Sequence, residues 1–256
     1  MLLQADYSQI ELRVLAMHSK DPTLVQAYRQ GADIHKFVAS QVYGVPLDLV
    51  TDDQRTAAKT VNFGIIFGRS LDSIIEQFID AAVEQCEKAG RTYNPEQLQA
   101  QATKDAREFW EGHHQQMPGV WAYMDREADR IKRTKHQMTF FGRERRYETV
   151  NKRAERQAYN FPIQSDAAEL TLRSIIKIGK AFRALELDAH IVLTVYDSIV
   201  VECCEDQMWQ VASVMKQIME GWDLPFINVP IVADFEAGYS WGKMKKIDVE
   251  NRRVAA

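Results

Sequence analysis

The chain has 256 residues, and 46% of them are hydrophobic, so it can bury a substantial core as one large domain or two subdomains. Its formal net charge of −4 excludes a globally basic nucleic-acid binder, so any grip on a phosphate backbone must come from local basic clusters. Three cysteines form neither a disulfide framework nor a zinc pattern. We expect no leader and no membrane-spanning segment, and therefore a cytoplasmic protein that makes no membrane contact.

The first twenty residues predict a strand followed by a helix. Leu2 to Asp6 has the pattern of a short strand, and Ile10 to His18 that of a helix. Ser8 and Glu11 have capping-box spacing, in which each side chain binds the other's backbone N–H, and this alone is a sufficient reason for Glu11. Asp6 is the last residue of this apolar strand, a place typical of metal or catalytic carboxylates and almost as often of simple turn residues.

The segment from Pro22 to Gly142 is mostly helical in pattern. One helix opens at Asp33-Ile-His35 and closes at Gly44-Val-Pro46, and Thr51 to Gln54 favours the start of the next. Amphipathic helices are then predicted over 70–88, 94–110 and 120–134, with a turn at Met117-Pro-Gly119 before the last of them.

A ridge of four side chains occupies the helix that begins after Gln54. Arg55, Lys59, Phe63 and Phe67 recur every fourth residue, so they lie nearly above one another on a helix. Two cations followed by two rings match the polarity of a nucleoside triphosphate, with its anionic tail and flat base. Solvated cations and core aromatics produce the same spacing, so the ridge alone does not decide the function.

The second half of the chain alternates strands with helices. Strand-turn-strand character over 139–147 precedes a long helix over 155–187, in which the amides of Asn160 and Gln164 suit either a helix start or a nucleic-acid minor groove. Two β-rich runs, 190–195 and 199–203, flank Tyr196-Asp197-Ser198 and predict a hairpin. We further expect a helix over 207–222, a strand over 226–235 and a frayed end over 243–256.

Two basic clusters precede and open the long helix. They are candidates for backbone-phosphate contacts, but ordinary solvated surface explains the composition equally well. Their members are Arg126, Arg130, Lys132, Arg133, Lys135, Arg143, Arg145, Arg146, Lys152, Arg153 and Arg156.

Three stretches together resemble the DNA polymerase I family (family A). Asp6 to Arg13 resembles its motif A, Arg55 to Gly68 its motif B, and Val195 to Ser198 its motif C, in the family's order along the chain. The resemblance runs from about Leu2 to Gly242. It implies an α+β fold: part of the right-hand polymerase, with an antiparallel palm sheet, a helical fingers insertion and no thumb. The implied division is palm over 1–22, fingers over 23–142 and palm again over 143–256.

The resemblance also implies template-directed DNA synthesis, with two Mg²⁺ ions as cofactors and with primer-template DNA and dNTPs as partners. The Asp6 and Asp197 carboxylates and the Tyr7 carbonyl would hold the metals, Lys59 would protonate the pyrophosphate, and Glu11 would act as a steric gate against a ribose 2′-hydroxyl. The implied nucleotide-binding residues are Tyr7, Ser8, Gln9, Glu11, His35, Arg55, Lys59, Phe63 and Phe67. The implied DNA-binding residues are Arg156, Asn160, Gln164 and Tyr196.

The chain departs from the family pattern at two motifs. Motif B usually ends in Tyr-Gly, and Phe67 lacks the hydroxyl that could hydrogen-bond Glu11, so we expect weaker rejection of ribonucleotides. Motif C usually reads His-Asp-Glu, and Ser198 offers no second carboxylate. The resemblance begins at motif A, so we expect a separate N-terminal polypeptide carrying the thumb and remaining palm, or an incomplete sequence.

Two other functions stay open at this point. A non-catalytic DNA-binding or scaffolding remnant would account for Tyr196-Asp197-Ser198, but gives no reason to keep Asp6 and Lys59 as well. A single-subunit RNA polymerase also combines a cationic helix with two aspartates, but Glu11 and the segment around Gln164 argue against it.

Overall fold

The computed structural model describes residues 1–66 and 68–254, apart from the side chains of Phe63 and Ile66. The chain divides into two compact units. Unit 1 comprises residues 1–17, 138–144 and 161–256, and unit 2 comprises residues 18–137 and 145–160. No helix among the described residues is both long enough and apolar enough to cross a bilayer.

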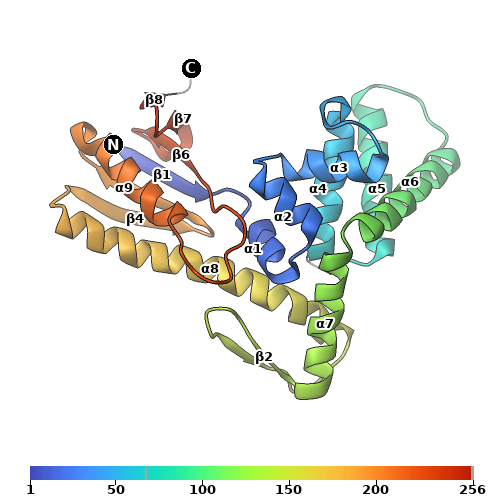
Figure 1. Ribbon diagram of the computed structural model, residues 1–256. Coiled ribbons are helices and arrows are strands. Elements are labelled where there is room, and N and C mark those ends of the chain that lie inside the picture. The colour runs from blue at the N-terminus through green and yellow to red at the C-terminus, as the bar shows by residue number, and fades with distance from the viewer. Residues whose placement is uncertain (67, 255–256) are drawn as a thin grey trace. The chain divides into compact units, whose positions relative to one another are not determined.

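Unit 1 is built on a six-stranded antiparallel sheet with the strand order β4-β5-β1-β6-β7-β8 (Figure 1). The strands are β1 (Leu2–Tyr7), β4 (Ala189–Val195), β5 (Ser198–Cys203), β6 (Ala233–Gly238), β7 (Lys245–Asp248) and β8 (Arg253–Val254). Alternate residues of β1 are buried, which assigns Leu3, Ala5 and Tyr7 to the core face. Helix α9 (Met208–Glu220) packs on β1 and β6. Asp6 therefore belongs to the opposite, more open face.

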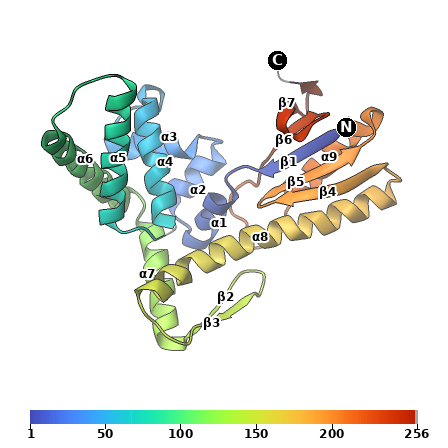
Figure 2. The same ribbon diagram turned by 180° about the vertical axis from the view of Figure 1, so that it is seen from behind.

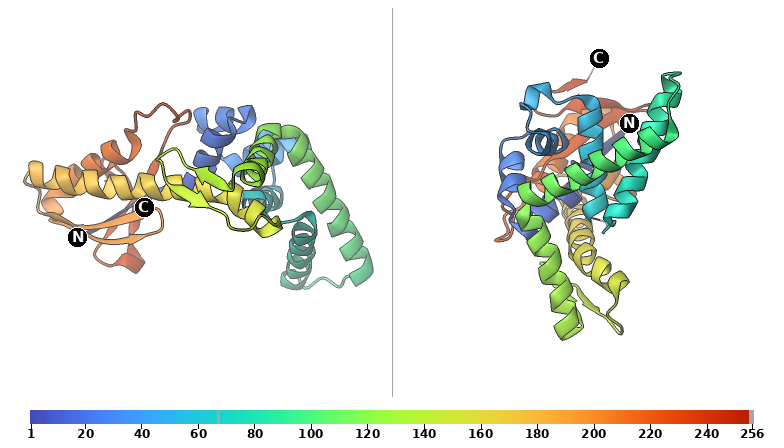
Figure 3. Two further views of the ribbon diagram at one scale, coloured as in Figure 1. Left: turned by 90° about the horizontal axis from the view of Figure 1, so that it is seen from below. Right: turned by 90° about the vertical axis from the view of Figure 1, so that its right-hand side faces the viewer.

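Unit 2 is helical. It holds α2 (Pro22–Arg29), α3 (Ile34–Tyr43), α4 (Asp52–Ile66), α5 (Leu71–Lys88), α6 (Pro95–Gln116) and α7 (Pro118–Thr134). Helix α3 packs against α4 and α6, and α5 packs along α6, as Figures 2 and 3 show. Large buried side chains such as Phe109, Tyr123 and Ile131 form its core. The thumb-less palm and fingers division stays a prediction.

The remaining elements connect these parts. Helix α1 (Ile10–Ser19) follows β1, and β2 (His136–Met138) pairs with β3 (Glu144–Arg146). Helix α8 (Lys152–Ala184) is one continuous helix, although Pro162 lies inside it. Short 3₁₀ turns occur at Leu47–Leu49, Glu205–Gln207 and Trp241–Lys243.

Most predicted elements are confirmed, including the helix over 207–222, but the last strand and the frayed end are wrong. The strand expected over 226–235 begins only at Ala233 and runs to Gly238, because its pairing is limited to the length of β1. The end expected to fray contains β7, in which Ile247 is buried and pairs with Phe235 of β6. Pairing with a distant strand orders a segment whose own composition is charged.

The turn predicted at Met117-Pro-Gly119 is the start of α7. Pro118 occupies the first position of this helix, where its missing N–H is not needed. The backbone N–H of Gly119 donates to the buried Asp21 carboxylate at 2.8 Å. A Cβ at residue 119 would lie 2.8 Å from the Asp21 Cα, so this approach requires glycine.

Candidate active site

The two predicted metal-binding aspartates lie at the end of β1 and at the tip of the β4–β5 hairpin. Because β1 and β5 are neighbouring strands, these two places are close together. Asp6 pairs in register with Ser198 on β5, and Asp197 immediately precedes Ser198 at the hairpin tip. The Tyr7 N–H donates to the Asp197 carbonyl at 3.4 Å. Residues 190 apart in sequence therefore meet, because β1 and β5 are antiparallel neighbours.

The hairpin tip presents Tyr196 to solvent. This residue has a φ of 54° and a side chain that is 95% exposed. Such a backbone conformation is uncommon for a bulky residue, and the turn of a tight hairpin accounts for it. The Ser198 hydroxyl donates to the Val195 carbonyl at 3.0 Å and the residue is buried, so it closes the hairpin.

The carboxylates of this region repel one another. Burial raises the pKa of Asp6 to about 6, with further increases from the charges of Asp197, Asp234 and Glu236. Burial is also the main cause that raises the pKa values of Asp197 and Glu11, and the charge of Asp197 adds to the increase for Glu11. Repulsion of this kind is relieved when a cation binds between the groups.

Asp234 and Glu236 were missed by the sequence reasoning. Asp234 pairs directly with Asp6 across β1 and β6, and Glu236 pairs with Gln4. The alternation of Ala233, Asp234, Phe235 and Glu236 is the signal that could have assigned the two carboxylates to one face of a strand. Among the described residues, no group of three or more His, Cys, Asp or Glu has the geometry of a metal site.

The capping box expected at Ser8 and Glu11 is not how this turn is held. The Ser8 N–H, which Glu11 was expected to accept, donates instead to the Val232 carbonyl at 2.9 Å. Gln9 adopts a left-handed φ of 53°, and Arg13 donates from Nε to the Ser8 carbonyl at 2.7 Å. The Ser8 N–H is therefore used in a backbone hydrogen bond beyond the end of β1. The capping box no longer explains why residue 11 is a glutamate.

Tyr7, the residue after Asp6, is anchored in the core of unit 1. The buried Tyr7 hydroxyl lies 2.7 Å from Ser174 Oγ and accepts a hydrogen bond from Trp222 Nε1 at 3.1 Å. Burial raises the pKa of Tyr7 to about 12, so the phenol stays neutral. A satisfied buried network of this kind fixes the end of β1 and with it the Tyr7 carbonyl and the Asp6 side chain.

In unit 2, helix α4 carries the predicted phosphate-binding cations. Thr51 and Gln54 form a reciprocal cap at its start, with distances of 3.0 and 3.2 Å between backbone N–H and side-chain oxygen. Arg55 Nε donates to Asp33 Oδ2 at 2.8 Å. Lys59 follows one turn later on the same ridge. Phe67 and the side chain of Phe63 lie outside the described residues, so the aromatic half of the ridge stays a prediction.

His35 lies in the first turn of α3 and is 3% exposed. Its Nδ1 lies 3.3 Å from Asn62 Nδ2 on α4. Burial lowers the pKa of His35 to about 4; Asp33 raises it, and Arg55 and Lys59 lower it further. The ring is therefore neutral at physiological pH and close to both cations of the ridge.

We expect His35 to lower the unfolding free energy as the pH falls from 6.5 towards 4. His35 takes up its proton in the unfolded chain near pH 6.5 but in the folded chain only near pH 4. Its contribution to this loss reaches about 2–3 kcal/mol at pH 4. Urea unfolding at several pH values measures the effect. His35→Gln should remove the part of the pH dependence that is due to His35, whereas a change at the exposed His190 should not; parallel profiles for His35→Gln and the wild-type chain would contradict the assignment.

The start of α8 carries the predicted minor-groove residues. Arg156, Asn160 and Gln164 are spaced four apart on one helix. The Asn160 Oδ1 atom is buried and has no hydrogen-bond partner among the described residues. Arg156 and Tyr159 lie so close to Gly68 that a Cβ there would approach their side chains within 3 Å.

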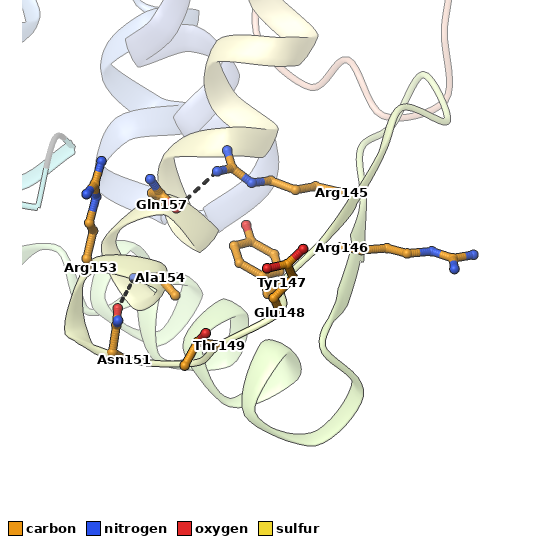
Figure 4. Close-up of a pocket in the computed structure, with 9 residues that line it drawn as sticks. All are labelled: Arg145, Arg146, Tyr147, Glu148, Thr149, Asn151, Arg153, Ala154 and Gln157. Atoms are coloured by element: carbon orange, nitrogen blue, oxygen red, sulfur yellow. Dashed lines mark hydrogen bonds between the residues drawn. The ribbon is translucent and has the colours of Figure 1, made fainter.

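A basic pocket of about 290 Å³ is lined by residues at the start of α8 and in the segment before it (Figure 4). Arg145 reaches across it and donates to Gln157 Oε1 at 3.0 Å, while Arg146 points away from it. Asn151 caps the start of α8 by accepting the Ala154 N–H at 3.0 Å. The lining residues are Arg145, Arg146, Tyr147, Glu148, Thr149, Asn151, Arg153, Ala154 and Gln157. Part of the predicted basic clusters thus surrounds a concave surface.

Comparisons with known proteins identify the family of this chain. A family described as DNA polymerase family A matches residues 1–243. The chain is 34% identical over 247 residues to DNA polymerase I of Pseudomonas aeruginosa, covering 94% of this chain and 24% of that protein. It is 32% identical over 253 residues to the thermostable DNA polymerase I of Thermus aquaticus, covering 96% of this chain and 27% of that protein. The chain thus spans about a quarter of the length of these relatives.

A solved structure has a fold similar to that of this chain. The POL domain of Pol1 from M. smegmatis, in complex with DNA primer-template and dNTP, superimposes with a TM-score of 0.77 at 28% sequence identity. The match covers 94% of this chain and 40% of that one. The mixture of helices with an antiparallel sheet is therefore that of a polymerase domain, and the chain belongs to DNA polymerase family A.

Proposed function

We propose that this chain carries the catalytic aspartates and the nucleotide-binding helix of a template-directed DNA polymerase. The observation that carries the proposal is the pairing of β1 with β5, which brings Asp6 beside the Asp197 hairpin tip. The raised pKa of Asp6, caused by burial and then by neighbouring carboxylates, marks a place with an excess of negative charge. The partners are primer-template DNA and dNTPs.

The donor set fits Mg²⁺, which prefers carboxylate and carbonyl oxygens. Asp6, Asp197 and the Tyr7 carbonyl would hold two such ions; when bound, the ions activate the primer 3′-hydroxyl and neutralise the leaving pyrophosphate. Ser198 takes no part, because its hydroxyl is used within the hairpin. The anchored Tyr7 phenol keeps these oxygens in place.

The other predicted residues act on the nucleotide and the DNA. Arg55 and Lys59 bind the triphosphate, and Lys59 donates the proton that the pyrophosphate takes up. Glu11 blocks a ribose 2′-hydroxyl, with Ser8 and Gln9 in the adjoining turn and Phe63 and Phe67 against the nucleoside. Tyr196 contacts the primer end, and Arg156, Asn160 and Gln164 follow the minor groove, where pair geometry is checked without reading sequence.

The test is Mg²⁺-dependent extension of a labelled primer-template. Because the chain covers 40% of the solved polymerase domain, we propose that activity also needs the elements of the remaining part, supplied by a separate N-terminal polypeptide or by further residues of the same protein. Assays therefore compare the chain alone with the chain plus a fragment carrying those elements. DNA binding without extension in either assay, equal with and without Mg²⁺ and dNTP, would favour the non-catalytic remnant.

Phe67→Tyr tests the steric gate. The family resemblance implies that a tyrosine hydroxyl at this position holds the gate glutamate, so we expect stronger rejection of ribonucleotides by about two- to tenfold, the net value of one typical hydrogen bond. The ratio of kcat/KM for dNTP and rNTP measures the effect. An unchanged ratio would show that Phe67 does not weaken the gate.

A further inference from the structure

We propose that Asp33 is a positioning residue that orients the Arg55 guanidinium for the nucleotide triphosphate. The inference rests on the proposed function, because it concerns how the cationic ridge of α4 is prepared for its ligand. Asp33 precedes α3, and α3 packs against α4, so one side chain can act on both helices. Asp33 lies outside the three motifs that carry the family resemblance.

The two carboxylate oxygens of Asp33 have separate partners. Oδ1 accepts the backbone N–H groups of His35 and Lys36 at 3.0 and 3.1 Å, which caps α3. Oδ2 accepts Arg55 Nε at 2.8 Å. The pKa of Asp33 is lowered overall: burial raises it, but the hydrogen bonds from Lys36 and Arg55 and the nearby positive charges outweigh burial. The carboxylate is therefore ionised and held to the helix by its own cap.

The atom that Arg55 uses decides what the contact does. A guanidinium is a rigid planar fork, so fixing Nε fixes the direction of both Nη groups. The ion pair engages Nε, and within the part of the chain that the structure describes no hydrogen bond uses Nη1 or Nη2. The Nη1–Nη2 edge presents two parallel N–H groups that can bind phosphate oxygens in a bidentate manner. Asp33 thus orders Arg55 while leaving its phosphate-binding edge available.

The same contact has an opposite interpretation, in which Asp33 is an anion that the triphosphate must displace from Arg55. The geometry favours orientation, because Oδ1 ties Asp33 to the start of α3 and the contact leaves the Nη edge uncovered. The two interpretations predict opposite signs. Removing a negative charge strengthens anion binding by simple Coulomb attraction, so a loss of binding can come only from lost orientation.

Asp33→Asn is the test variant, since asparagine caps a helix as well as aspartate does but its second atom is an amide nitrogen that cannot accept from Arg55. The matched control is Asp72→Asn, the same charge change at an exposed position in the first turn of α5. Calorimetric titration with inorganic tripolyphosphate and Mg²⁺ measures phosphate binding without requiring polymerase activity. Thermal unfolding checks that both variants keep the fold.

We expect Asp33→Asn to weaken tripolyphosphate binding by about two- to fivefold, as suits an ion pair that is about one-third exposed. Asp72→Asn should leave binding unchanged. In the Arg55→Ala background, Asp33→Asn should have no further weakening effect, because the residue acts only through Arg55. Where extension is measurable, the KM for dNTP should rise while kcat and the affinity for primer-template stay the same.

The outcomes separate this inference from the proposed function. If Arg55→Ala leaves tripolyphosphate binding unchanged, the ridge does not bind phosphate and both proposals fail at this helix. If Arg55→Ala weakens binding but Asp33→Asn leaves it equal or tighter, the phosphate role of Arg55 stands and the positioning role of Asp33 is overturned.

Discussion

Asp197→Asn is expected to lower the rate of primer extension by at least about 10²–10³-fold, the usual cost of removing one preorganised charge-stabilising group from an active site. Asparagine keeps the shape of the hairpin tip but removes one of the two carboxylates beside which Mg²⁺ is proposed to bind. Ser198 cannot replace it, because this buried hydroxyl donates to the Val195 carbonyl. Single-turnover extension in the preparation that is active measures the effect.

The same substitution should not destabilise the chain. The charge of Asp197 contributes to the raised pKa of Asp6, so the two ionised groups repel each other in the folded state. Removing one charge relieves this repulsion, and the unfolding free energy should stay equal or increase. The control is Asp188→Asn, an exposed carboxylate just before β4. Extension by Asp197→Asn at more than half the wild-type rate would remove Asp197 from the catalytic site.

Asp21→Ala is expected to lower the unfolding free energy by about 2–4 kcal/mol. Asp21 is fully buried, and its Oδ1 accepts the N–H groups of Thr23 and Leu24 at 3.0 and 3.2 Å. Its Oδ2 accepts the Gly119 N–H at 2.8 Å. One side chain thus caps α2 and α7, whose starts are far apart in sequence, and alanine would leave three backbone donors without this partner.

Asp21→Asn separates the two caps. The amide oxygen can still accept from Thr23 and Leu24, but its nitrogen cannot accept from Gly119, so we expect a smaller loss than for alanine. Asp125→Ala, at an exposed position on α7, is the control. Urea unfolding midpoints at constant m-value measure the stability of Asp21→Ala, Asp21→Asn and Asp125→Ala. Equal stability of Asp21→Ala and the control would show that the buried carboxylate does not link the two helices.

Local chemistry was enough to predict most of the elements and one of the caps. Thr51 and Gln54 do form a reciprocal cap, and Gly44 ends α3 with a φ of 64°, because these interactions depend on residues within one turn of each other. The β4–β5 hairpin was predictable for the same reason.

Long-range pairing decided the rest. Asp234 and Glu236 act on Asp6 because β6 is the other neighbour of β1, and no local pattern contains that register. The N–H of Ser8 was assigned to Glu11 by spacing, yet Val232, more than two hundred residues away, accepts it. A backbone group binds the nearest suitable partner in space, and sequence spacing measures that distance only within a helix or a turn.

The sequence by itself determined the family, through three short motifs in order, and determined which residue types are offered for metal, phosphate and DNA. Only the tertiary structure decided that Asp6 stands among three other acidic groups, that Asp21 caps two helices and that Asp33 holds Arg55. These are contacts between segments 22 or more residues apart. Their energies come from burial and from charge at short range, which exist only once the chain has folded.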